Sequence, residues 1–224
     1  MNSTRLFLVA VALVLGSQLV SAQDLSRYRG YVLDSSLESV LAASALRATD
    51  AKTLHERPAK IQELEWRAPY LSSRDELADP VRGIIFSFCD DALYQVLVSY
   101  DRDRTDGLSN GDIIASLTTT YGTPVLRSAH NRPLDAPPDT VVLAQWDRAG
   151  SSLTLLRGVY SAEFQLILTA KALSTRARSA VREAARLDTA EAPRRELEQR
   201  KKEAADATAA RNKIRTTNKA AFRP

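Results

Sequence analysis

The stretch from Gly83 to Asp101, GIIFSFCDDALYQVLVSYD, constrains the fold more than any other part of the chain. Apolar residues alternate with other residues along both of its halves, and a period of two rich in β-branched and aromatic side chains is typical of β-strands. Between the halves, Cys89 to Ala92 form a short segment that suits a tight reversal. The stretch predicts a β-hairpin, which needs more strands and a covering helix to be stable in water.

Two helices are predicted from their capping residues. Ser35 precedes an apolar stripe at helical spacing, and Glu38, three residues on, completes a capping box. Ser109 and Asp112 stand in the same relation before a second stripe, and Gly122 marks the end of that helix. Each helix precedes a predicted sheet segment, so each has an apolar surface to pack against.

The remaining strands are predicted from the same alternation of apolar residues. Thr49 to Pro58 is expected to be a connection. The predicted strands outside the hairpin are Ile61 to Arg67, Val141 to Trp146, Ser151 to Leu156 and Glu163 to Ala170.

The order of capped helix, Trp-bearing strand and paired strands therefore occurs twice. Leu64-Glu65-Trp66 and Ala144-Gln145-Trp146 take equivalent places in the two copies. We expect an α+β domain over residues 23–172, in which tandem helix-plus-antiparallel-sheet units, about 30–101 and 106–171, share one core. The alternative is that helix-then-sheet order recurs by chance, as it can in any α+β chain.

This arrangement resembles the fold of the beta-lactamase inhibitor proteins and of related small outer-membrane assembly lipoproteins. The resemblance covers about residues 30–171 and includes the helix ending Tyr121-Gly122-Thr123-Pro124. It implies two units joined in one longer sheet and a tendency to bind proteins. The inhibitors carry disulfides, which a chain with Cys89 alone cannot form, so inhibition of a beta-lactamase is not implied.

The first 22 residues are typical of a targeting signal rather than of a part of the fold. Arg5 is followed by the apolar run Leu6 to Leu15 and by the small-residue site Val20-Ser21-Ala22, as in a cleavable signal peptide. An uncleaved membrane anchor is the alternative, but the run is shorter than the ~20 residues of a spanning helix. We expect a periplasmic or secreted bacterial protein.

The charge of the chain is unevenly distributed. Residues 173–224 hold 14 Lys and Arg against 7 Asp and Glu, whereas residues 23–172 hold 16 against 20. Leu173 to Leu187 and Arg194 to Ile214 are each typical of a helix, with an interruption predicted at Asp188 to Pro193. The chain from Asn218 onward is expected to be disordered in isolation.

This basic helical tail could contact an anionic surface outside the cell membrane. Because an exported protein meets few nucleic acids, we expect a protein partner or an anionic envelope surface instead. A merely solvated charged helix is the alternative, since Glu residues are interspersed. The candidate contacts are Arg194, Arg195, Arg200, Lys201, Lys202, Arg211 and Lys213.

The sequence contains no assembled catalytic, cofactor-binding or metal-binding motif. His55 and His130 fall in no metal-ligand spacing. The carboxylates beside Cys89 favour its thiol form and disfavour a nucleophile. A periplasmic hydrolase or metal-dependent enzyme would have to gather Asp90, Asp91 and Asp101 with His55 in one pocket.

Aromatic side chains offer a possible partner-binding surface, because Trp and Tyr are favoured at interfaces. Trp66, Trp146, Tyr94 and Tyr100 are the candidates; the alternative is that both Trp fill the core. The sequence therefore favours a non-catalytic exported binding or envelope-assembly factor, with a hydrolase or metal-dependent enzyme as the second hypothesis and a purely structural envelope protein as the third.

Overall fold

The computed structural model describes residues 24–69, 79–125, 136–221 and 223. The predicted signal peptide and His130 lie outside these residues. The strands are β1 (Arg27–Tyr28), β2 (Tyr31–Val32), β3 (Ala51–His55), β4 (Ile61–Arg67), β5 (Val81–Cys89), β6 (Ala92–Tyr100), β7 (Thr140–Asp147), β8 (Ser151–Gly158) and β9 (Phe164–Ala170). The helices are α1 (Leu37–Ser44), the 3-10 helix η1 (Ala48–Asp50), α2 (Asn110–Tyr121) and α3 (Lys171–Ala221).

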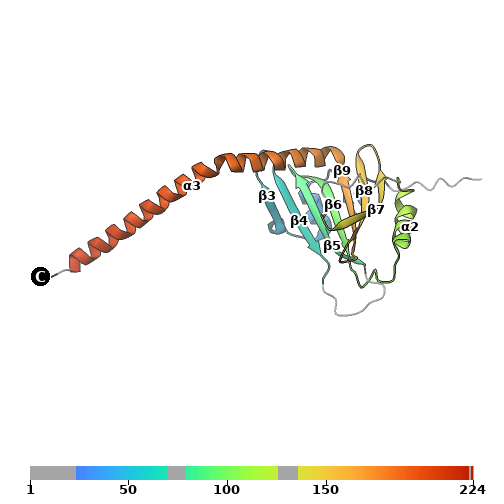
Figure 1. The fold of residues 1–224 in the computed structure, drawn as a ribbon, viewed down its shortest axis with the longest axis horizontal. Coiled ribbons are helices and arrows are strands. Elements are labelled where there is room, and N and C mark those ends of the chain that lie inside the picture. The colour runs from blue at the N-terminus through green and yellow to red at the C-terminus, as the bar shows by residue number, and fades with distance from the viewer. Residues whose placement is uncertain (1–23, 70–78, 126–135, 222, 224) are drawn as a thin grey trace, which may run out of the picture.

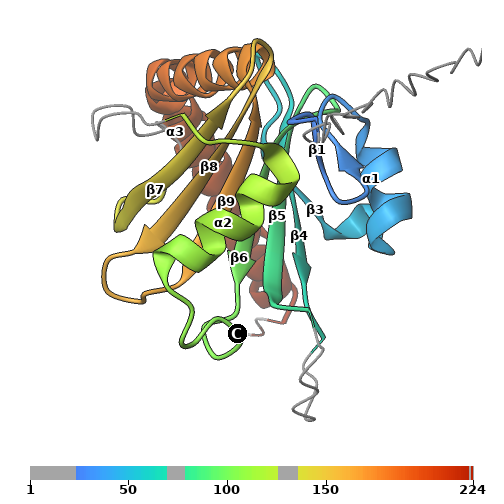
Figure 2. The ribbon, with the colours of Figure 1, turned by 90° about the vertical axis from the view of Figure 1, so that its right-hand side faces the viewer.

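Seven of the strands form one antiparallel sheet in the order β3-β4-β5-β6-β9-β8-β7. Figure 2 shows α1 and α2 on one face of this sheet and α3 behind it. In Figure 1, α3 begins at the end of β9, crosses the ends of the strands and projects far beyond the edge of the domain. The α+β class and the C-terminal helical tail are thus as the sequence predicts.

The central hairpin is the prediction that the structure reproduces most closely. β5 and β6 pair from Val81 to Tyr100, and the two turn residues Asp90 and Asp91 have φ of 48° and 69°. Positive φ at both turn positions matches the right-handed twist of the strands, and Asp tolerates it better than most residues. This geometry explains why two adjacent carboxylates occupy the reversal.

The two units meet edge to edge where β6 pairs with β9. Leu97 faces Ile167 across this junction. The row that they share continues on one side through Ile85 to Glu65 and on the other through Thr154 to Gln145. Residues that stand at the same offset along the chain from Leu97 and from Ile167 therefore occupy equivalent positions. The register is symmetrical about a local two-fold axis that passes between these two residues, normal to the sheet. The axis relates β4, β5 and β6 to β7, β8 and β9.

One hydrophobic core serves both units. It lies between the sheet and the two short helices, and its buried members come from strands on both sides of the junction, among them Leu64, Phe86, Val96, Leu155 and Leu168. α1 contributes Leu37 and Leu41, and α2 contributes Ile113, Ile114 and Leu117. The shared core supplies the additional strands and the covering helices that the central hairpin needs to be stable in water.

Three local predictions are wrong. Ser36, not Ser35, caps α1 by accepting a hydrogen bond from the Ser39 backbone N–H, and no capping box with Glu38 forms. The Ser35 hydroxyl instead donates to the Val32 carbonyl at 2.6 Å. The predicted connection from Thr49 to Pro58 contains β3, whose exposed edge position lacks the alternation by which the other strands were recognised.

The predicted interruption at Asp188 to Pro193 is also wrong, because α3 continues through it to Ala221. Proline removes one backbone hydrogen bond and tends to bend a helix rather than always end it. Figure 1 shows that α3 changes direction after leaving the sheet. Among the described residues, no helix combines the length and the apolarity needed to cross a bilayer.

Candidate interaction surface

The first half of α3 is fixed to the sheet by small side chains. Ser174, Ala177, Ala180 and Ala184 are its buried residues, spaced three or four apart along one face of the helix. Ala177 and Ala180 pack in a cluster with Ile61 and Cys89 that also includes Ala59 and the half-buried Tyr94. Small residues let the helix backbone approach the strand ends closely, so this half belongs to the folded domain.

Ion pairs reinforce the same contact at three points. Lys171 reaches Asp147 at 2.5 Å, Arg176 pairs with Asp90 in the hairpin turn, and Arg57 makes a two-pronged contact with Glu191. The side-chain hydrogen bond from Arg57 lowers the pKa of Glu191, with the Arg57 charge adding to the effect. Exposed pairs contribute little stability individually, but these three fix where along the sheet the helix lies.

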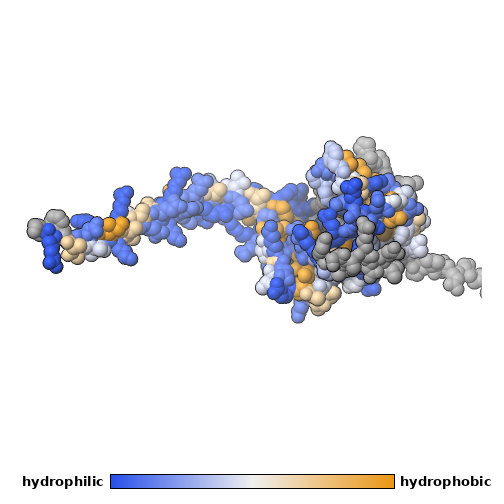
Figure 3. All heavy atoms as spheres, turned by 90° about the horizontal axis from the view of Figure 1, so that it is seen from below, coloured by the Kyte–Doolittle hydropathy of each residue, from blue (hydrophilic) through white to orange (hydrophobic). Residues whose placement is uncertain are grey.

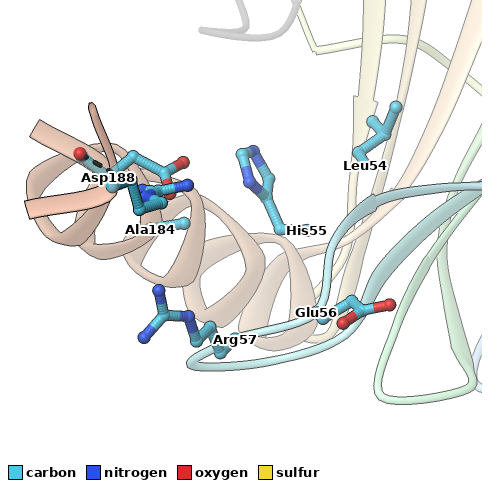
Figure 4. Close-up of a pocket in the computed structure, with 7 residues that line it drawn as sticks. Leu54, His55, Glu56, Arg57, Ala184 and Asp188 are labelled. Carbon is cyan, nitrogen blue, oxygen red and sulfur yellow. Dashed lines mark hydrogen bonds and ion pairs between the residues drawn. The ribbon is translucent and has the colours of Figure 1, made fainter. Parts of the chain in front are cut away.

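A small cavity lies where α3 leaves the sheet, and Figure 4 shows the residues that surround it. His55 projects between the β3 edge and the helix. The cavity has a volume of about 230 Å³ and would admit a few water molecules. Within the described residues, no group of three or more His, Cys, Asp or Glu could hold a metal ion. The lining residues are Leu54, His55, Glu56, Arg57, Ala184, Asp188 and Arg195.

Beyond this point every residue of α3 from Ala192 to Ala221 is exposed. We call residues 192–221 the projecting segment; at 1.5 Å per residue it is about 45 Å long. It contains nine Lys and Arg against four Asp and Glu. Figure 3 shows a mostly hydrophilic surface along it, and its large apolar residues Leu197 and Ile214 are 53% and 60% exposed. All seven cations predicted from the sequence lie on this segment.

The four aromatic candidates do not form a surface. Trp146 is completely buried, and its indole N–H donates to the Gly122 carbonyl at 2.5 Å. Trp66 and Tyr100 are partly buried against the same core, whereas Tyr94 packs near α3 on the other side of the sheet. The prediction that they line a binding face is replaced by the alternative that the Trp residues belong to the core.

The acidic residues of the enzyme hypothesis are also separated. Asp90 and Asp91 lie at one end of β6 and Asp101 at the other, about 30 Å apart along the strand. Each of the three accepts backbone hydrogen bonds, from Lys60, Leu37 and Asp103 respectively. These carboxylates cap turns and a helix start, so they and His55 do not assemble a catalytic site.

Cys89 is buried beneath α3. Burial is the main cause that raises the pKa of its thiol, with a further contribution from the Asp90 charge and an opposing one from Arg176. The sequence predicts this direction from the neighbouring carboxylates alone, but the helix that buries the thiol is the larger cause. The residue is a small apolar core group in this fold.

A group of tyrosines with an ion pair lies at the far end of the sheet from α3. Arg29 contacts Asp79 through two hydrogen bonds of 2.5 and 2.8 Å and lies over the Tyr28 ring. The Arg29 hydrogen bond lowers the pKa of Asp79, while burial raises the pKa of Tyr28 and raises that of Tyr121 to about 12. Neutral, buried tyrosines of this kind stabilise the end of the core.

Three glutamines occupy the sheet face opposite α1 and α2. Gln95 Nε2, Gln145 Oε1 and Gln165 Oε1 are buried atoms without a hydrogen-bond partner in the structure. Buried polar atoms are normally satisfied by protein or by ordered water. Because these glutamines lie in different rows of the sheet, on β6, β7 and β9, they do not converge on one ligand.

An exposed apolar group lies at the strand ends remote from α3. Val141, Val159 and Tyr160 are 48%, 54% and 87% exposed, and the Val159 N–H donates to the Asp139 carbonyl, which brings the β8–β9 turn against the start of β7. We call these three residues the hairpin-end patch. The sequence alone does not reveal this patch, because the contact of the β8–β9 turn with the start of β7 follows from the fold.

Comparison with known proteins gives no further guidance. The chain matches no protein-family model, and no curated protein or solved structure is significantly similar to it.

Proposed function

We propose that this chain is a non-catalytic, exported binding or assembly factor. In this proposal the α+β domain holds a protein partner, and the projecting segment reaches an anionic envelope surface. The observation that carries the proposal is the projecting segment: a helix anchored in the domain core over its first half and fully exposed over its second. A long exposed helix needs a partner to account for its length, since its own domain does not pack against it.

The hairpin-end patch is the proposed contact for the protein partner. It presents one aromatic and two aliphatic side chains to solvent, and Tyr is favoured at protein interfaces because it supplies a large, rigid contact area. It lies at the opposite end of the strands from α3. A partner could therefore bind there without displacing the helix.

Export is part of the proposal and is supported by residues 1–22. The resemblance to the beta-lactamase inhibitor proteins and small assembly lipoproteins supports protein binding and remains part of the proposal as well. The separation of Asp90, Asp91 and Asp101 gives the enzyme hypothesis no geometric support.

The test is photo-crosslinking in the cells that produce the protein. A photoreactive amino acid replaces Tyr160 in one variant and Ala115, an exposed residue of α2, in the control. The proposal expects a discrete adduct of higher mass from position 160 and none from position 115. It is refuted if position 160 gives no discrete adduct, or if both positions give the same products.

A further inference from the structure

The charges of the projecting segment are arranged unevenly around the helix. With 3.6 residues per turn, six cations fall within about 120° of the circumference. We call these six residues the basic face. They are Arg194, Arg200, Lys201, Arg211, Arg215 and Lys219.

All four acids of the segment lie outside the basic face. Glu196 and Glu203 lie beyond one border, Glu198 beyond the other, and Asp206 opposite. Arg194 and Arg200 come within 3.9 and 4.0 Å of Glu198 and Glu196, at the limit of an ion pair, and both pairs are exposed. Such contacts weaken the positive field of the face only slightly.

The rest of the protein lies away from the basic face. The centre of the stripe that packs on the sheet, from Ser174 to Ala184, lies about 150° around the helix axis from the centre of the basic face. A flat surface could therefore touch the basic face along its length while the domain stays to one side. The basic face and the stripe that packs on the sheet belong to one continuous helix.

We propose that the basic face binds a lipid bilayer that contains anionic phospholipids, with the helix lying along the headgroups. This inference rests on the proposed function and names the surface that the projecting segment reaches. A planar surface can contact only one side of a helix, and this is the side from which acids are missing. A flexible polyanion could wrap around the helix and would gain nothing from such one-sidedness.

The binding is electrostatic rather than insertional. Leu197 is the single large apolar residue near the middle of the basic face, so the face lacks the apolar stripe of helices that bury themselves at the interface. Each Lys or Arg near an anionic bilayer contributes on the order of a fivefold gain in affinity. Binding should therefore require anionic lipid and weaken steeply with added salt.

The test measures sedimentation of residues 23–224 with lipid vesicles. Phosphatidylcholine vesicles with phosphatidylglycerol are compared with vesicles of phosphatidylcholine alone. The test variant carries Arg211→Gln and Arg215→Gln on the basic face; its matched control carries Lys202→Gln and Lys213→Gln, which remove equal charge from the opposite side. We expect the wild type to bind only anionic vesicles, the test pair to weaken binding by about 30-fold, and the control pair by less than about threefold.

Three outcomes would overturn the inference. They are no binding to anionic vesicles, equal binding to neutral vesicles, and equal losses in the two pairs. The wild type could instead bind soluble polyphosphate but no vesicles, with polyphosphate binding weakened by the test pair. In that case the occupant is a polymer and the bilayer assignment is wrong. None of these results alters the crosslinking expected at position 160, so failure here is distinguishable from failure of the proposed function.

Discussion

Trp66 and Trp146 are related by the local two-fold axis at the β6–β9 junction. Trp66 shares a row of the sheet with Ala144, and Trp146 shares a row with Leu64 on the other side of the Leu97 row, so each tryptophan sits diagonally opposite the other. Their surroundings nevertheless differ. Trp146 is fully buried and hydrogen-bonded to the Gly122 carbonyl, whereas Trp66 is only partly buried.

This difference predicts unequal effects of removing the two side chains. Trp146→Ala should lower the free energy of unfolding by about 3–5 kcal/mol, because it leaves a large cavity in the core. Trp66→Ala should cost less than about half of that. Urea unfolding followed by circular dichroism measures both, and equal losses would contradict the assignment of Trp146 alone to the closed core.

The helix caps predict a second contrast. Asp112 accepts the Ser109 backbone N–H at 2.8 Å in a complete capping box, whereas Glu38 in the first turn of α1 forms no capping box. Asp112→Ala should cost about 1 kcal/mol of stability, and Glu38→Ala no more than about half as much. Thermal unfolding of the two variants at neutral pH checks this, and a larger loss from Glu38→Ala would show that the caps are assigned wrongly.

The position of Pro193 predicts that the local stability of α3 is lowest where the helix leaves the sheet. Pro193→Ala restores one donor for a backbone hydrogen bond and should stabilise the helix locally by up to about 3 kcal/mol. Amide hydrogen exchange over the following turns should slow by about tenfold or more. As the opposite control, Ala207→Pro should speed exchange in the middle of the projecting segment; unchanged exchange in the Pro193 variant would refute the prediction.

Cys89 reports on the attachment of α3. Because the thiol is buried and its pKa is raised, a maleimide should label it slowly in the folded protein. Ala177→Asp places a charge in the buried contact and should speed labelling by about tenfold or more by loosening the helix. Ala185→Asp, on the exposed side of the same helix, is the control, and similar rates for the two would show that α3 does not protect the thiol.

The Arg29–Asp79 pair predicts an acid dependence of stability. The pKa of Asp79 in the folded protein lies below its ordinary value of 3.8, so the pair's contribution is present above about pH 4 and is lost as the pH falls through the lowered pKa. Asp79→Asn should therefore lower the melting temperature at neutral pH, and the gap to the wild type should shrink near pH 3. A gap that is constant across this range would rule out the linkage.

The sequence predicts those parts of the molecule whose signal is local. The two-residue period of the central hairpin, the Ser109–Asp112 box and the equivalence of the two Trp strands need only neighbouring residues. β3 was missed because an exposed edge strand has no apolar face, as Lys52 and Thr53 show. The sequence does not predict that α3 continues past Pro193, because the contacts around this point are not local. Glu191 pairs with Arg57, which is far away in the sequence, and Asp188 pairs with Arg195, seven residues later.

The candidate site was predicted only in part. The excess of cations in the tail is visible in the composition, but the sorting of six of them onto one face appears only once the helix is known to run without a break from Lys171. The hairpin-end patch depends on the exposure of Val159 and Tyr160 in the β8–β9 turn, which no local pattern specifies. The aromatic candidates failed because burial, not residue type, decides whether a Trp can reach a partner.

The pairing of β6 with β9 has a consequence for a shorter chain. A fragment of residues 24–101 would end at β6 and leave that strand as an open edge, with Val96 and Val98 at equal distances on either side of Leu97. Two such fragments could pair their β6 strands about Leu97 in the register that β9 now adopts. The register of the sheet is thus that of a symmetrical dimer, although β3 and α3 each belong to one half only.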